Sequence, residues 1–306
     1  MTRKRGNSLG FWIFRTALRL TGLRGAYGLL YFPSLHYLLF DPPARTAALA
    51  YLRRRFPGHG WLRLHLDAYR LFIEQGKNLL DRYYLLGGGT GIHFEIDGLE
   101  KLQELRRQNQ GFILLTAHLG NWQAAMQPLH GLDTTVHLLM RAEENQAVLE
   151  ALRLTCGGGR IQVLSSENFI EEVPKLVEVL GRGEIVSIMG DRSYGADTVP
   201  VQFLGEARFP YGAFGIAAAV GCPVVVLLAA KTDARSYRVT IADLFSPRYV
   251  RGIPKRDQLA AWAQRYAGVL EEFTRQHPFQ CFLFHDVWAH AAGVSGNPGT
   301  NHTPAG

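Results

Sequence analysis

Cysteine is scarce in this chain of 306 residues, which has three, Cys156, Cys222 and Cys281. They are odd in number, far apart and form no CxxC pair, which argues against a disulfide framework. We expect reduced thiols in the core of a protein on the cytoplasmic side.

A triple glycine at 87–89 is not followed by Gly-Lys-Ser/Thr, the pattern of a phosphate-binding loop. It predicts instead the end of a helix and a flexible connection to the next element.

The first forty residues contain no acidic side chain. Six basic residues stand there among aromatic residues and leucines: Arg3, Lys4, Arg5, Arg15, Arg19 and Arg24. The uncharged run 25–40 is short for a membrane span and is interrupted by Pro33 and His36. This composition predicts that 1–40 is a basic helical segment associated with an anionic membrane surface. The alternative is a helix packed on the domain, with its arginines in water.

Other signatures are missing as well. The formal net charge of +7 comes without any zinc-knuckle, helix-turn-helix or RNP-like pattern, which disfavours nucleic acid as a partner. No GxSxG elbow is present, so a covalent serine mechanism is poorly supported. His277, His285 and His290 lie near one end of the sequence, but no HExxH pattern accompanies them. We expect neither a metal ion nor a cofactor.

The chain does contain a regular alternation of strand-like and helix-like segments. The expected strands are 92–96, 111–117, 134–139, 161–164, 184–189, 237–241 and a last buried piece at 281–284. The expected helices are 44–56, 60–86, 99–108, 121–130, 145–155, 169–180 and 257–276. The alternation predicts an α/β fold with a single domain at 41–290, whose mostly parallel central sheet is flanked by helices.

Two further segments need separate treatment. The uncharged run 209–230 is long enough for a transmembrane helix. Gly221-Cys222-Pro223 divides it, however, into an alanine-rich helix and a valine-rich strand, as in a buried α/β unit. Residues 291–306 are rich in Gly, Pro, Asn and Thr, which predicts a disordered tail.

The most informative stretch is 111–123, GFILLTAHLGNWQ. Its apolar first half is typical of a strand that is buried on both faces. His118 follows that strand, Gly120 permits a sharp turn, and Asn121 is a good helix N-cap. The histidine is therefore expected at the carboxyl edge of the sheet, where open α/β sheets bind their ligands.

The string from His118 to Gln123 resembles the HxGNWE signature of the bacterial lipid A biosynthesis acyltransferases. The resemblance extends to an Arg-x3-Asn block at 141–145, a Gly-Asp-Arg block at 190–192, a VxFxG…PxG block at 201–212 and a looser closing block at 276–285. Together these blocks cover about 44–288. The resemblance implies a glycerolipid-acyltransferase-like fold and an enzyme on the cytoplasmic face of the bacterial inner membrane. Such an enzyme moves a fatty acyl chain from acyl carrier protein or acyl-CoA to a hydroxyl or amine of a lipid or glycolipid acceptor, such as a lipid A precursor.

The resemblance makes His118 the general base, but the acid of the family motif is here an amide, Gln123. An amide can accept a hydrogen bond from the imidazole but brings no charge. Either Asp191, at the end of a neighbouring strand, supplies the carboxylate, or the enzyme is slow or inactive. A catalytically silent lipid-binding or scaffold protein is therefore the alternative function, and a soluble esterase is a third.

Five residues are candidates for substrate binding. The helix that begins at Asn121 could direct backbone N–H groups at the reacting carbonyl. Arg141 and Arg192 could bind phosphate or an acidic carrier protein, or else form structural ion pairs. Pro210 and Gly212 could shape a substrate loop, or be ordinary turn formers.

Overall fold

The computed structural model describes residues 8–86, 88–140, 161–165, 169–192, 197–285 and 287–288. The expected helix at 145–155, Arg141, Cys156, His290 and the expected tail at 291–306 lie outside these ranges.

A mixed sheet forms the centre of the fold, with the strand order β1-β9-β8-β2-β5-β3-β4. Its strands are β1 His93–Asp97, β2 Phe112–Thr116, β3 Val136–Met140, β4 Ile161–Ser165, β5 Ile185–Met189, β8 Val224–Asp233 and β9 Ser236–Phe245. Neighbouring strands are parallel in every pair except β8 and β9. The α/β class and the mostly parallel sheet are therefore confirmed.

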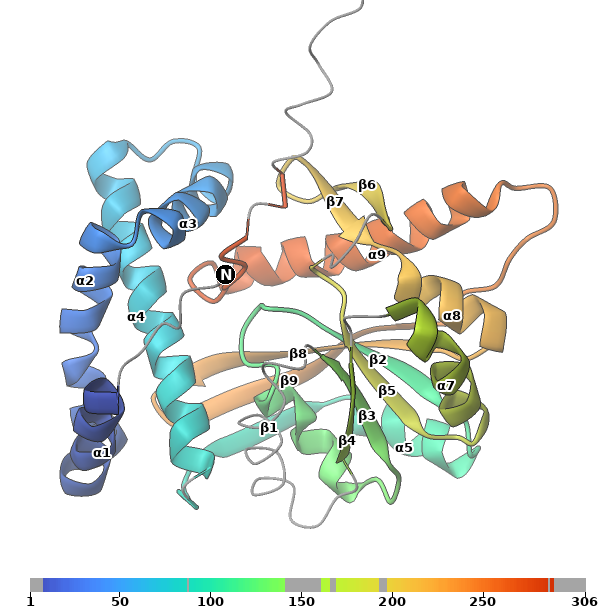
Figure 1. The fold of residues 1–306 in the computed structure, drawn as a ribbon, viewed down its shortest axis with the longest axis horizontal. Coiled ribbons are helices and arrows are strands. Elements are labelled where there is room, and N and C mark those ends of the chain that lie inside the picture. Colours follow the sequence, from blue (N-terminus) through green and yellow to red (C-terminus); the bar gives the residue numbers. More distant parts are fainter. Residues whose placement is uncertain are drawn as a thin grey trace, which may run out of the picture.

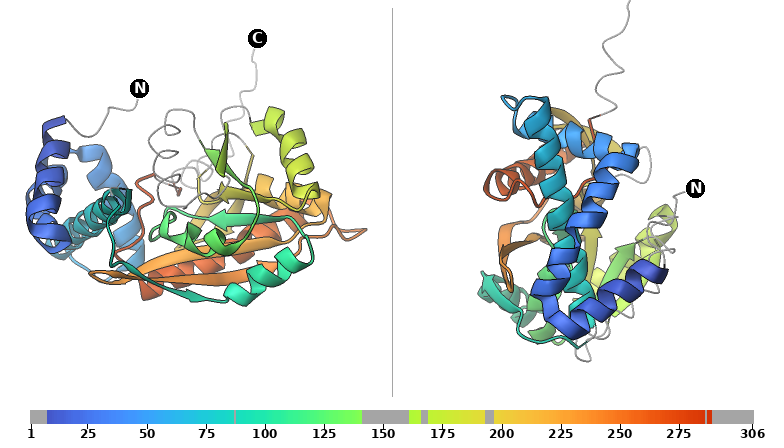
Figure 2. Two further views of the ribbon diagram at one scale, coloured as in Figure 1. Left: turned by 90° about the horizontal axis from the view of Figure 1, so that it is seen from below. Right: turned by 90° about the vertical axis from the view of Figure 1, so that its left-hand side faces the viewer.

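Helices cover both faces and one end of this sheet (Figures 1 and 2). They are α1 Ser8–Leu29, α2 Tyr31–Phe40, α3 Pro42–Arg55, α4 Trp61–Leu86, α5 Leu99–Arg107, η1 Ala124–Gly131, α7 Phe169–Gly181, α8 Gly212–Val220 and α9 Lys255–Gln276. The uncharged run 209–230 is indeed divided, into α8 and β8. Within the part of the chain that the structure describes, none of the helices combines the length and the hydropathy needed to cross a bilayer.

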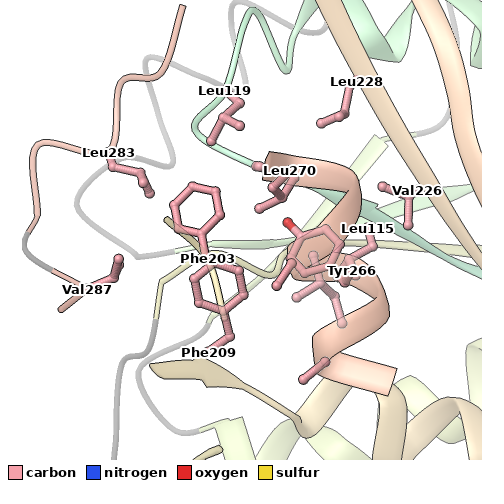
Figure 3. Close-up of a cluster of buried hydrophobic side chains, with 14 of the residues drawn as sticks. Leu115, Leu119, Phe203, Phe209, Val226, Leu228, Tyr266, Leu270, Leu283 and Val287 are labelled. Atoms are coloured by element: carbon pink, nitrogen blue, oxygen red, sulfur yellow. The ribbon is translucent and has the colours of Figure 1, made fainter. Parts of the chain in front are cut away.

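The central strand β2 is fully buried, as its apolar sequence predicts. Ile113 and Leu115 pack in one cluster with α9, whereas Phe112 and Leu114 pack in a second cluster with α5 and η1. Alternate residues of a strand point to opposite faces, so a continuous apolar run is required here. Figure 3 shows the first of these clusters, in which Leu115 lies near Tyr266 of α9.

One local expectation was wrong, and one element was not expected. Residues 121–130 were expected to form an α-helix, but η1 is a 3₁₀ helix. Pro128 lacks the N–H that an α-helix needs in its interior, and this favours the tighter, shorter form. The sequence also gave no sign of the antiparallel hairpin of β6 Thr198–Gln202 and β7 Glu206–Pro210, which adds Phe203 and Phe209 to the core.

The N-terminal helices are folded against the domain, at the left of Figure 1. Leu23, Ala26 and Leu30 are buried in a cluster with Leu80 of α4. The predicted N-terminal helical segment is therefore present, and one side of it belongs to the core. Arg15, Arg19 and Arg24 are exposed, in keeping with either interpretation of that segment.

Candidate active site

His118 and Asp191 come together because β2 and β5 are parallel neighbours. Each residue stands two positions beyond the end of its strand. Nδ1 of His118 lies 3.0 Å and 3.1 Å from the two carboxylate oxygens of Asp191. The backbone N–H of His118 also donates to Oδ2 of Asp191, at 2.7 Å. One carboxylate therefore holds both the ring and the main chain of the histidine.

Asp191 is fully buried, whereas the side chain of His118 is 21% exposed. Burial acts to raise the pKa of the Asp191 carboxyl. The charge and hydrogen bonds of His118, with a contribution from Arg192, outweigh burial and bring this pKa below its ordinary value. Asp191 is therefore an ionised carboxylate at neutral pH, and it faces an imidazole that solvent can reach.

The turn after His118 is fixed by strand β8 on one side and by the segment 280–282 on the other. Gly120 has φ +62°, and a Cβ at this position would come within 1.9 Å of the Ala229 carbonyl oxygen of β8. The N–H of Gly120 donates to the carbonyl of Gln280 at 2.7 Å, and the N–H of Phe282 donates to the carbonyl of His118 at 2.8 Å. The glycine is required both by the left-handed backbone and by this close approach.

Asn121 caps the turn with its side chain. Its Oδ1 accepts from the N–H groups of Gln123 at 3.2 Å and Ala124 at 3.1 Å. Its own N–H donates to Ala229 at 2.8 Å, and its carbonyl accepts from Ala125. The capping expected of the Asn121 side chain is therefore present, and the N–H groups of Gln123 and Ala124 are paired with it. That backbone N–H groups of this turn face a reacting carbonyl stays a prediction.

Gln123 does not take the place of the motif acid beside the imidazole. Among the described residues, no hydrogen bond joins its side chain to His118, whose Nδ1 is directed at Asp191. The Nε2 atom of Gln123 is buried and has no partner in the same part of the chain. A catalytic role for Gln123 stays a prediction without a supporting contact.

Of the other predicted residues, Arg192 lies nearest to the pair. Its Nη2 donates to the carbonyl of Leu283 at 3.0 Å. Its Nε is buried without a partner among the residues described. Pro210 ends β7 and Gly212 begins α8. Within the described ranges, no hydrogen bond connects either of them to His118 or Asp191.

Sequence reasoning missed the residues that hold the turn from behind. The side chain of Gln280 pairs with both backbone groups of Lys231, each at 2.8 Å. Asn78 of α4 donates to the carbonyl of Gly120 at 2.7 Å. Asp81 of α4 and Tyr237 of β9 are buried near them. The available signal was weak: Lys231 is a charge at the end of the apolar run 224–230, and Asp81 stands beside Arg82 in a helix that carries other charges.

A pocket of about 550 Å³ is lined in part by Gln280. Its walls come from α1, α4, the end of β8 and the segment after α9, and include Arg70, Lys77 and His277. Burial is the main reason why the pKa of His277 is lowered. Neither His118 nor Asp191 lines this pocket. We therefore place the candidate chemistry at the His118–Asp191 pair. Among the described residues, His, Cys, Asp and Glu side chains nowhere gather in a group of three or more that could hold a metal ion.

Comparison with known proteins agrees with the geometry at the end of β2 and β5. No curated protein gives a significant match to the chain. The sequence profile of the bacterial lipid A biosynthesis acyltransferases, in contrast, matches residues 90–290, which include the His118 turn, Asp191 and the closing segment with Gln280. With about two thirds of its length matched, the chain belongs to the bacterial lipid A biosynthesis acyltransferase family.

Proposed function

We propose that this protein transfers a fatty acyl chain from a thioester, carried by acyl carrier protein or coenzyme A, to a hydroxyl or amine of a lipid A precursor or a related envelope glycolipid. His118 acts as the general base and Asp191 as its charged partner. The reaction takes place at the cytoplasmic face of the bacterial inner membrane. A metal ion or cofactor has no part in this proposal.

The contact between His118 and Asp191 is the observation that carries the proposal. Because Nδ1 faces the carboxylate, Nε2 is the nitrogen left for the acceptor hydroxyl. A buried carboxylate on Nδ1 orients the ring and stabilises the imidazolium that forms when Nε2 takes up a proton. The partly exposed ring of His118 lies at the carboxyl edge of the sheet, where a substrate can approach it.

The reaction needs no covalent enzyme intermediate. Nε2 of His118 removes the proton of the acceptor hydroxyl while the hydroxyl oxygen attacks the thioester carbon. The tetrahedral intermediate collapses, the carbon–sulfur bond breaks, and the imidazolium returns its proton to the departing thiolate. The Nε–H of Arg192, which has no partner among the described residues, is the candidate donor to the oxyanion or to a substrate phosphate, because the N–H groups of Gln123 and Ala124 already pair with Asn121.

The proposed function is tested by purified protein in detergent micelles. The donor is either acyl-acyl carrier protein or acyl-CoA, and the acceptor is extracted lipid A precursor. Mass spectrometry should detect an acceptor heavier by one acyl chain, and the two donors identify the carrier. If neither donor yields acylated lipid while the protein binds micelles of the same precursor, the silent lipid-binding alternative replaces the enzyme. Fatty acid release without transfer would indicate the esterase alternative.

The outer side of α2 supplies a surface for membrane contact. Its exposed apolar side chains are Tyr31, Phe32, Leu35, Leu39 and Phe40, which we call the α2 face. The exposed arginines of α1 precede it in the chain. Apolar side chains beside basic ones are typical of interfacial helices on anionic lipid. We place the α2 face in the headgroup region of the membrane.

Replacing Phe32, Leu35 and Leu39 together by serine should release the protein from the membrane. Each inserted side chain contributes about 1.5–3 kcal/mol, so the loss of three should weaken binding by on the order of 1,000-fold or more. The measurement is sedimentation with vesicles that contain anionic phospholipid. The control replaces Val250 and Ile253, which are also exposed but precede α9, by serine.

The control variant should sediment like the parent protein. Undiminished sedimentation of the triple variant would show that the α2 face is not the membrane contact. Surface substitutions are preferable to deletion of 1–40, because deletion would also remove Leu23 and Leu30 from the core and strip the covering from α4.

A further inference from the structure

A buried network of hydrogen bonds lies behind the turn that carries His118. At its centre is Asp81 of α4, which is 0% exposed. Oδ2 of Asp81 lies 2.5 Å from Nζ of Lys231, and the hydroxyl of Tyr237 donates to the same oxygen at 2.5 Å. The hydroxyl of Tyr27 donates to Oδ1. Elements α1, α4, β8 and β9 therefore meet at one carboxylate.

This network reaches the turn at two adjacent residues. Nδ2 of Asn121 donates to the hydroxyl of Tyr237 at 3.2 Å. Asn78, one helical turn before Asp81, donates to the carbonyl of Gly120 at 2.7 Å. The second and third residues after His118 are thus held by side chains from α4 and β9. His118 itself is held from the opposite side by Asp191.

Burial fixes the direction of the hydrogen bonds. It raises the pKa of the Tyr237 hydroxyl well above its ordinary value, and the charge of Asp81 raises it further. Tyr237 therefore keeps its proton, donates it to Asp81, and accepts from Asn121. A fully satisfied polar network in a low-dielectric interior is rigid, whereas a buried ion pair by itself contributes little net stability.

We propose that Tyr237, oriented by the Asp81–Lys231 pair, is a positioning residue for acyl transfer, which acts through Asn121 to fix the turn that aims His118 at the acceptor. The inference rests on the proposed function, because it concerns the rate of that reaction. Asp81 lies outside the segment 90–290 that matches the family, so the family comparison does not point to it. Asn78 supports the same turn at Gly120.

Tyr237→Phe is the sharpest test, because it deletes one hydroxyl and keeps the Asp81–Lys231 pair. We expect kcat to fall roughly 10- to 100-fold, since a small misplacement of a catalytic group has effects of this size. KM should change little, because binding groups are untouched. The matched control is Tyr27→Phe, which also removes one phenolic hydrogen bond to Asp81, although among the described residues Tyr27 makes no hydrogen bond to Asn121. It should keep the parental kcat and lose a similar amount of melting temperature.

A double-mutant cycle separates positioning from general weakening. Asn121→Ala should lower kcat by at least as much as Tyr237→Phe. In the Asn121→Ala background, Tyr237→Phe should then lower kcat no further, because its path to His118 is already cut. Additive losses in kcat would overturn the proposal, as would a parental kcat in the single variant Tyr237→Phe.

The assay is the micellar acyl transfer described above, run first with the parent protein. If the parent transfers no acyl chain, the proposed function fails. If the parent is active and Tyr237→Phe equals it, only the positioning role fails. Should Tyr237→Phe not fold, Asn121→Ala takes its place, because it removes the hydrogen bond through which Tyr237 acts on the turn. A parental kcat in that variant would overturn the proposal, and a kcat lowered as predicted for Tyr237→Phe would support it.

Discussion

Replacing His118 by asparagine should lower the rate of acyl transfer by roughly 100- to 10,000-fold, the range that general base catalysis contributes. The structure makes asparagine a better replacement for His118 than alanine. Its side-chain amide can still donate to the buried Asp191 carboxylate, but it cannot accept a proton at neutral pH. The rate is measured by acyl transfer in micelles, and the melting temperature is measured alongside it.

His118→Ala is the companion variant. It leaves the Asp191 carboxylate with fewer partners, so it should cost about 1–3 kcal/mol of stability in addition to the activity. Undiminished transfer by either variant would refute the role of His118 as base. If both variants lost their fold, a purely structural histidine would explain the contact with Asp191.

The second large effect is expected at Asp191. Asp191→Asn should reduce kcat on the order of 10,000-fold, the size of the equivalent change in a serine protease triad. Gln123→Ala should have a small effect, because the Gln123 side chain makes no hydrogen bond to His118 among the described residues. Gln123→Glu should not help, since Nδ1 of His118 already faces the Asp191 carboxylate, so the ring has its charged partner without a second acid.

The opposite order of effects would indicate a decayed enzyme. In that case Gln123→Glu would be markedly faster than the parent, and Asp191→Asn would stay near parental activity.

The pH dependence of stability gives an independent check on the ionised state of Asp191. The pKa of Asp191 is lower in the folded protein than in the unfolded chain. The ionised carboxylate therefore stabilises the fold at a pH above its unfolded-state pKa, and this stabilisation is lost as the pH falls through its folded-state pKa. The melting temperature of Asp191→Asn should therefore depend less on pH in the acid range.

The sequence was most informative where one local signal determined the structure. The apolar run of β2 could only be a strand buried on both faces, and a parallel partner strand then places Asp191 beside His118. Gly221-Cys222-Pro223 divided the run 209–230 as expected, because neither glycine nor proline suits the interior of a helix. Asn121 also caps the turn as its residue type predicts.

The rest depended on contacts between distant parts of the chain. Nothing near Asp81 in the sequence indicates that Tyr237 and Lys231 will meet it, because β8 and β9 fold back against α4 much later. The motif alone did not identify the hydrogen-bond partner of the His118 ring either. The position of Gln123 in the HxGNWE string suggests that it is this partner, yet the ring is directed at Asp191. The 3₁₀ form of η1 was not expected either, because the apolar residues at 124–129 fit an α-helix equally well.

The closing segment of the chain has a consequence for the order in which the protein matures. His118 and Gly120 are completed by main-chain bonds from Phe282 and Gln280. During synthesis at about 5–20 residues per second, these partners emerge on the order of ten seconds or more after the histidine. The strands β5 and β8 can already cover β2 in that interval, but the turn has no support from this side. A ribosome-bound chain would thus hold a nearly finished sheet and an unfinished site, and catalytic competence would arrive with the last part of the domain to be made.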